Sequence, residues 1–181
     1  MVRLGSNEAN ASDAERFSET VQDSGGPMEQ TLADMTMMAA DRRDAGYETV
    51  TVPTGDTAPK DPDSGDDDKW GLTYVVPGNK AQECKALYNR ASFDETGVYQ
   101  ATVGGITYIV TECLDHDAEL ALFVAGAYEI RHAPALVRTA MDRGRMYTHL
   151  KKLDSTHLGT IEHDDPEAFF PNPESIYAYE Q

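Results

Sequence analysis

The chain has 181 residues, of which 40% are hydrophobic, and this is enough for one folded domain with a core of ordinary size. No apolar run approaches the roughly 18 residues of a membrane span, and the first residues lack the apolar stretch of a secretory signal, so we expect a cytoplasmic protein without membrane contact. The formal net charge is −17, but Tyr, Val, Ile and Leu recur in periodic runs, which excludes a disordered acidic chain.

The acidic residues are spread along the whole chain, which has 18 Asp and 14 Glu against only 6 Lys. This distribution favours adaptation to molar salt, in which the Debye length falls to about 3 Å and repulsion between like charges is screened. Mimicry of nucleic acid is the alternative, and it requires the acidic residues to gather on one face of the fold.

Composition divides the chain into three parts. Residues 1–26 are polar and end in a Ser-Gly-Gly stretch, so we expect a flexible N-terminal arm. Residues 27–171 carry the hydrophobic pattern of a folded domain, which is interrupted by an acidic loop at 53–69. Residues 172–181 form a C-terminal tail.

The first half of the domain predicts two helices and two strands. Pro27 suits the first turn of the first helix, whose methionine stripe is expected to face the core. Asn79 and Gln82 have the spacing of a capping box, and Cys84 lies on the apolar face of that second helix. The predicted ranges are 27–43 and 79–92 for the helices and 47–52 and 70–76 for the strands.

A hairpin at Gly104-Gly105 is the most distinctive element of the second half. A two-residue turn there pairs Val103 with Ile106 and Tyr99 with Val110, so alternate side chains share one face. The next apolar run, 119–130, is hydrophobic on both parities and predicts a third, central strand of an antiparallel meander.

A third helix follows from Pro134 to Gly144, with Met141 on its buried stripe, and two last strands at 145–153 and 157–163 flank a polar turn. The expected fold class is α+β, a single domain with a mostly antiparallel sheet of about 7 strands and 3 main helices. Its order is α-β-β-α-β-β-β-α-β-β.

No metal or cofactor motif is complete. The Asp-rich stretch KDPDSGDDDKWG, read as a calcium loop from Asp61, places Gly65 and Leu72 where carboxylate ligands are required, so we expect a solvated loop. GxSxG, GxxxxGK[ST] and GxGxxG are absent, and Cys84 and Cys113 have no CxxC spacing. We therefore expect no cofactor, no metal and two free thiols.

The segment 131–152 departs from the acidic composition, since Asp142 is its only acid. Such a segment either neutralises acids of its own fold, as Arg138 and Asp142 do at helical spacing, or contacts an unknown protein or a small anionic ligand. Nucleic acid is the less favoured partner, because only Tyr147 offers an aromatic ring and molar salt weakens phosphate contacts. The candidate contact residues are Arg131, His132, Arg138, Arg143, Arg145 and Lys151.

The last hairpin offers an alternative site made of His149, His157, His163 and Asp164. A two-residue turn would separate His149 from the other two histidines, whereas a three-residue turn would place all three on one face. If these histidines lie close to one another and to an acidic side chain, the protein is expected to be a metal-dependent, hydrolase-like enzyme. This is the alternative to the favoured interpretation, a non-catalytic or regulatory binding protein.

Four stretches resemble a family of small, acidic haloarchaeal proteins that form a domain of unknown function. They are ETVTVPTGDTAPK from Glu48, YVVPGN from Tyr74, YEIRHA from Tyr128 and MYTHLKKLDSTHLGTIEHDDPEAFF from Met146. The resemblance covers about 27–171 and implies the cytoplasm of a halophilic archaeon. It implies no activity, cofactor or catalytic residue.

Overall fold

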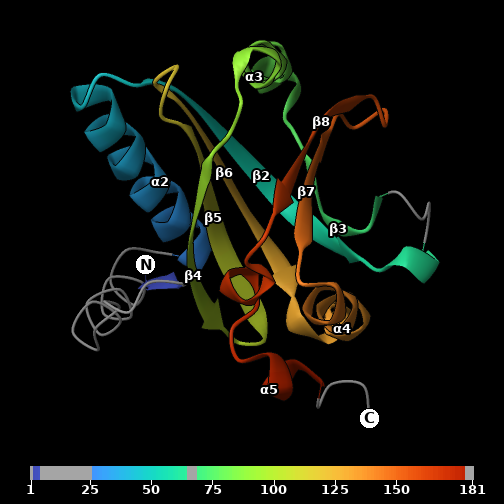
Figure 1. The fold of residues 1–181 in the computed structure, drawn as a ribbon. Helices are drawn as coiled ribbons and strands as arrows, with labels where there is room; N and C mark the ends of the chain where they lie inside the picture. Colours follow the sequence, from blue (N-terminus) through green and yellow to red (C-terminus); the bar gives the residue numbers. More distant parts are fainter. Residues whose placement is uncertain (1, 5–25, 65–68, 178–181) are drawn as a thin grey trace.

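The computed structural model describes residues 2–4, 26–64 and 69–177. In this part of the chain, eight strands form one sheet in the order β1-β4-β5-β6-β2-β3-β7-β8 (Figure 1). The pairs β2 with β6 and β3 with β7 are parallel, and the other neighbours are antiparallel. The strands are β1 (Val2–Leu4), β2 (Glu48–Lys60), β3 (Gly71–Val75), β4 (Glu95–Val103), β5 (Ile106–Asp115), β6 (Leu120–Glu129), β7 (Met146–Lys151) and β8 (His157–His163).

Helices connect and cover these strands. They are α2 (Pro27–Asp44), α3 (Gly78–Arg90), α4 (Pro134–Arg143) and α5 (Pro173–Tyr177), with short 3-10 turns η1 (Pro62–Ser64), η3 (Ile130–His132) and η4 (Pro166–Phe169). The predicted α+β class and order of elements are confirmed, with β1 and α5 added at the ends. None of the helices in the described ranges is long and apolar enough to cross a membrane.

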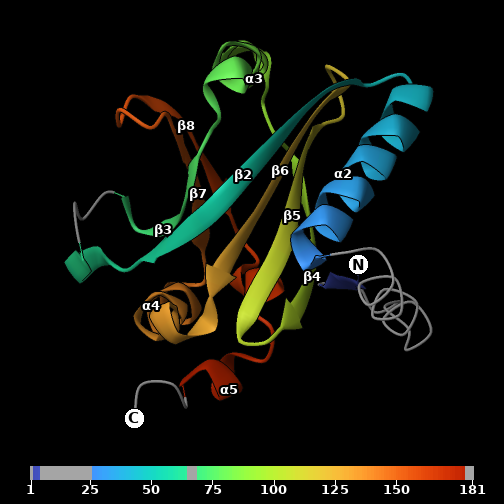
Figure 2. The ribbon, with the colours of Figure 1, turned by 180° about the vertical axis from the view of Figure 1, so that it is seen from behind.

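The two faces of the sheet carry separate cores. Seen from behind, α2 lies over β5 and β6 and packs Met35 and Ala39 against Phe123 and its neighbours (Figure 2). On the other face the β7–β8 hairpin crosses in front of β2 beside β4 to β6, with α3 and α4 at opposite ends (Figure 1). The side chains between them form the larger core and include Leu72, Tyr74, Leu122, Tyr128, Leu136, Met146, Leu150 and Phe170.

The predicted meander is confirmed in its register. Val103 lies opposite Ile106 and Tyr99 opposite Val110, and β6 continues the antiparallel order on the far side of β5. Gly104 and Gly105 have φ angles of 59° and 79°, as a two-residue hairpin turn requires. Both predicted thiols, Cys84 and Cys113, are free and buried.

Three local predictions were wrong. The strand expected to end at Val52 continues as β2 to Lys60, so the first part of the predicted acidic loop at 53–69 is a strand. Pro77 is the N-cap of α3 and no side chain caps that helix, so Asn79 and Gln82 form no capping box. Met141 is 37% exposed because α4 turns its other side to the core.

The predicted arm at 1–26 lies outside the described residues, apart from Gly26 and the backbone of Val2–Leu4, which pairs with β4. Part of the Asp-rich stretch, residues 65–68, also lies outside them. Of the predicted tail at 172–181, the described part is a short turn and α5.

Candidate functional site

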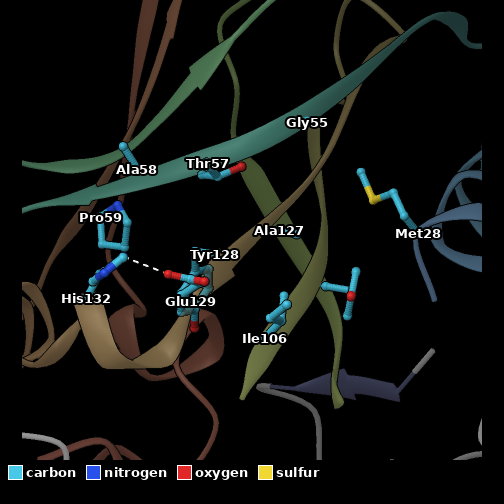
Figure 3. Close-up of a pocket in the computed structure, with 11 residues that line it drawn as sticks. Met28, Gly55, Thr57, Ala58, Pro59, Ile106, Ala127, Tyr128, Glu129 and His132 are labelled. Atoms are coloured by element: carbon cyan, nitrogen blue, oxygen red, sulfur yellow. Dashed lines mark ion pairs between the residues drawn. The ribbon is translucent and has the colours of Figure 1, made fainter. Parts of the chain in front are cut away.

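A cavity of about 620 Å³ opens on the face of the sheet that α2 covers only in part. Its volume lies in the range typical of pockets for small molecules. Figure 3 shows Met28 of α2 on one side and Pro59 and His132 on the other, with Thr57 and Ala127 between them. The lining residues are Met28, Gly55, Thr57, Ala58, Pro59, Ile106, Tyr108, Ala127, Tyr128, Glu129 and His132.

The cavity exists because α2 is shorter than the sheet face it covers. The pair Val110 and Ala125 lies under the helix, whereas the next pair on that face, Tyr108 and Ala127, lines the cavity. The register of β2 with β6 also shifts between Pro53 and Asp56, beside Ala127. The hydroxyl Oγ1 of Thr54 donates 2.6 Å to the carbonyl of Ala125 at this irregularity, which satisfies a buried acceptor. Among the described residues, apolar surface is thus left uncovered next to an irregular strand.

Polar groups lie at the rim and on the floor of the cavity. The carboxylate Oε2 of Glu129 is 3.1 Å from both Arg131 Nε and His132 Nδ1, and all three side chains are largely exposed. Thr57 is only 5% exposed, and its Oγ1 has no hydrogen-bond partner among the described residues. This oxygen lies against Gly126 and near the Tyr74 ring, on the face of the sheet that carries the larger core, so protein encloses it.

The predicted basic segment does not form one surface. Arg131 and His132 share Glu129, and His132 alone among the six candidates lines the cavity. The guanidinium of Arg143 lies 5.3 Å from the centre of the Trp70 ring. Arg138 and Arg145 are exposed on and just after α4, and Lys151 ends β7. Contact with a partner through this whole segment stays a prediction.

The last hairpin pairs the histidines in a way that neither turn length predicted. The backbone N–H of Lys152 donates to the carbonyl of Thr156, which closes a three-residue loop. A register shift follows, since Lys151 faces His157 but Leu150 faces Gly159. The extra residue changes the parity of β8, so His149 and His157 share one face and His163 lies on the other.

A hydrogen-bond chain joins the two histidines that share a face. His149 Nε2 lies 2.8 Å from the carbonyl of Trp70, which only accepts, so this nitrogen carries the hydrogen. His149 Nδ1 is then the acceptor for the hydroxyl of Thr160, at 2.9 Å, and that oxygen accepts in turn from His157 Nε2, at 3.1 Å. Burial is the main cause that lowers the pKa of both imidazoles.

His163 has a structural environment on the opposite face. Its nitrogens lie 2.8 Å from Thr148 Oγ1 and 3.0 Å from Thr96 Oγ1, and its ring packs on Phe169. Burial lowers its pKa to about 3. Asp164 is exposed, and within the described ranges no three His, Cys, Asp or Glu side chains are grouped to hold a metal ion. The four residues of the alternative site are therefore not brought together.

Comparison with known protein families shows which family the chain belongs to. Residues 14–171 match a family of unknown function (DUF7529). The chain belongs to this family. No curated protein and no solved structure matches it.

The DUF7529 match includes the cavity and the last hairpin, and it begins before the expected position 27. Sequence reasoning missed most of the cavity, because Met28, Tyr108 and Ala127 are ordinary apolar residues whose exposure depends on where α2 begins. It also missed Thr160, which joins His149 to His157. One signal in the sequence was available. Lysine is scarce, and three of the six lysines, Lys60, Lys69 and Lys85, lie in separate segments whose charges act on these histidines.

Proposed function

We propose that this DUF7529 chain is a non-catalytic binding protein that holds a small amphipathic molecule in the cavity beside β2. The observation that carries the proposal is the 620 Å³ cavity itself, which has apolar walls and a few polar groups at defined places. Pockets of this size and character are the usual sites of small ligands.

The arrangement supports a ligand with an apolar body and one anionic end. Tyr108, Ile106 and Met28 offer apolar surface for the body. At the rim, Arg131 donates to the Glu129 carboxylate and His132 Nδ1 lies 3.1 Å from the same oxygen, so a ligand carboxylate can compete for these two side chains.

The test uses 8-anilinonaphthalene-1-sulfonate, an apolar aromatic anion whose fluorescence rises in apolar sites. We expect saturable binding of one probe per chain, and we expect Ala127→Leu to weaken it at least tenfold because leucine fills the cavity. Ala86→Leu, on the exposed side of α3, is the matched control and should leave binding unchanged.

Circular dichroism of both variants establishes that they are folded. Equal binding by the wild type and folded Ala127→Leu, or non-saturable uptake, would exclude the cavity as the ligand site.

We further propose that this binding takes place in the cytoplasm of a halophilic archaeon, where it has a regulatory role. The net charge of −17 and the spread of the acids support the high-salt setting. The proposal is supported by His132, one of the predicted contact residues, which lines the cavity and shares the Glu129 carboxylate with Arg131.

A further inference from the structure

Four of the six lysines of the chain surround the His149–Thr160–His157 chain. Lys151 is the cross-strand partner of His157, and Lys85 Nζ donates 2.8 Å to the carbonyl of the neighbouring Leu158. Lys69 precedes Trp70, whose carbonyl holds His149, and Lys60 pairs with the next residue, Gly71. The charges of Lys60 and Lys69 act on His149, and those of Lys69 and Lys85 on His157.

These lysines differ from other basic residues of the fold. Arg42, Arg90 and Lys80 form ion pairs with Glu112, Glu48 and Glu83. In the described ranges, none of the four lysines around the histidines forms an ion pair with a carboxylate. Within those ranges, positive charge without a carboxylate partner therefore gathers around the two histidines, in a chain with 32 acidic residues and 15 basic ones. Mutual repulsion of these lysines is unfavourable unless an anion joins them.

We propose that Lys60, Lys69, Lys85 and Lys151, together with His157, form a binding site for a small phosphate-bearing anion. Ammonium groups bind phosphate as point charges, and a doubly charged phosphate gains more from several of them than chloride does. Because His157 Nε2 is held by Thr160, its Nδ1 is left to face the anion, and it has no partner in the part of the chain that the structure describes. This site is distinct from the cavity and does not depend on it.

Binding is coupled to protonation of His157. A bound phosphate stabilises the imidazolium, so it raises the pKa of His157, whereas burial, and then the charges of Lys69 and Lys85, lower that pKa in its absence. The titratable groups near the ring are Lys151 and His149 on β7, Lys85 on α3 and Lys69 before β3, while Lys60 on β2 acts on His149. Glu162 lies on the same face of β8 and is exposed.

The test is an NMR titration of histidine-labelled protein in about 2 M KCl, with and without inorganic phosphate. We expect phosphate to raise the pKa of His157 by about half a unit, which corresponds to about threefold tighter binding to the imidazolium form. An equal ionic strength of added KCl should not do so. If KCl produces the same shift, or if phosphate produces none, the proposal is wrong.

Single substitutions of the lysines test which side chains hold the phosphate. Lys69→Gln and Lys60→Gln should abolish the response to phosphate, and Lys85→Gln should do the same if it folds without the bond to Leu158. Lys80→Gln, on the same helix as Lys85 but paired with Glu83, should retain the full response. A uniform loss in all four variants would contradict the site.

A parallel titration with glycerol 3-phosphate shows whether the site takes the free ion or a phosphate monoester, since the stronger shift identifies the ligand.

Discussion

At the scale of single residues, His163 shows what burial does to a titratable group. The imidazole is 3% exposed, bonds only to threonine hydroxyls and has a pKa lowered to about 3. In the unfolded chain a histidine has a pKa of about 6.5. Between these two values the unfolded chain binds one proton more than the folded chain, so acid favours unfolding.

We predict that the free energy of unfolding keeps its full value above about pH 6.5. Below that pH, protonation of His163 in the unfolded chain lowers it by up to about 1.4 kcal/mol per pH unit. The burial of His149 adds to this slope. His163→Gln keeps a donor and an acceptor for the two threonines but does not titrate. Its free energy of unfolding, measured by denaturant between about pH 5 and pH 7, should depend less on pH. His132→Gln, at a 57% exposed position, should keep the wild-type slope. Parallel curves for wild type and His163→Gln would contradict the assignment.

Residue patterns alone could not place the three histidines of the last hairpin. The sequence indicates both strands and a polar turn, and these are present. The face of each histidine depends on the extra residue in β8, where Lys85 takes the carbonyl of Leu158 and Tyr88 bonds to Thr160. Those contacts come from α3, far away in the sequence, so local alternation does not reveal them.

At the scale of elements, the contact between β2 and β6 depends on Gly126. A Cβ atom there would lie 2.2 Å from Thr57 Oγ1 and 2.8 Å from the Tyr74 ring. We predict that Gly126→Ala lowers the free energy of unfolding by about 1–3 kcal/mol, because the packed side chains must move. Gly55→Ala is the matched control, since its Cβ would meet nothing within 4 Å.

A double-mutant cycle with Thr57→Ala tests the cause. Removing the threonine oxygen should recover part of the loss in Gly126→Ala, as measured by denaturant titration in high salt. Simple additivity of the two substitutions would show that the clash with Thr57 is not the source of the loss.

Elements were predictable where their partners are close in sequence. The β4–β5–β6 meander follows from the glycine turn and local alternation, and its register was correct. The continuation of β2 past Pro53 was not, because prolines remove backbone donors and usually end a central strand. Here the irregularity between Pro53 and Asp56 accommodates Pro53, and Pro59 lies in the end of β2 that pairs with β3.

At the scale of the whole molecule, the charge predicts a salt requirement. With a net charge of −17, like-charge repulsion opposes the compact state in dilute buffer, whereas a Debye length of about 3 Å at molar salt screens it. We predict a clearly higher midpoint of thermal unfolding in about 2 M KCl than in about 50 mM KCl, measured by circular dichroism. Equal midpoints would contradict salt adaptation and leave the acidic residues to another role.

The candidate sites belong to this scale as well, which explains why the sequence did not reveal them. The cavity depends on the length of α2 relative to the sheet, and the lysine cluster gathers residues from β2, α3, β7 and the segment before β3. Neither produces a local pattern. The basic segment 131–152 did produce one, but the fold distributes its members over separate surfaces.

The parallel pairing of β2 with β6 also sets an order of assembly. Glu48 lies opposite Leu120, so the first part of β2 leaves the ribosome long before its partner exists. Hairpins such as β4–β5 close locally and early, whereas pairings between distant segments are slow and leave strand edges open in the meantime. The junction of β2 and β6 therefore forms late in synthesis. The cavity lies at that junction, so its ligand would bind only a chain that has completed its central sheet.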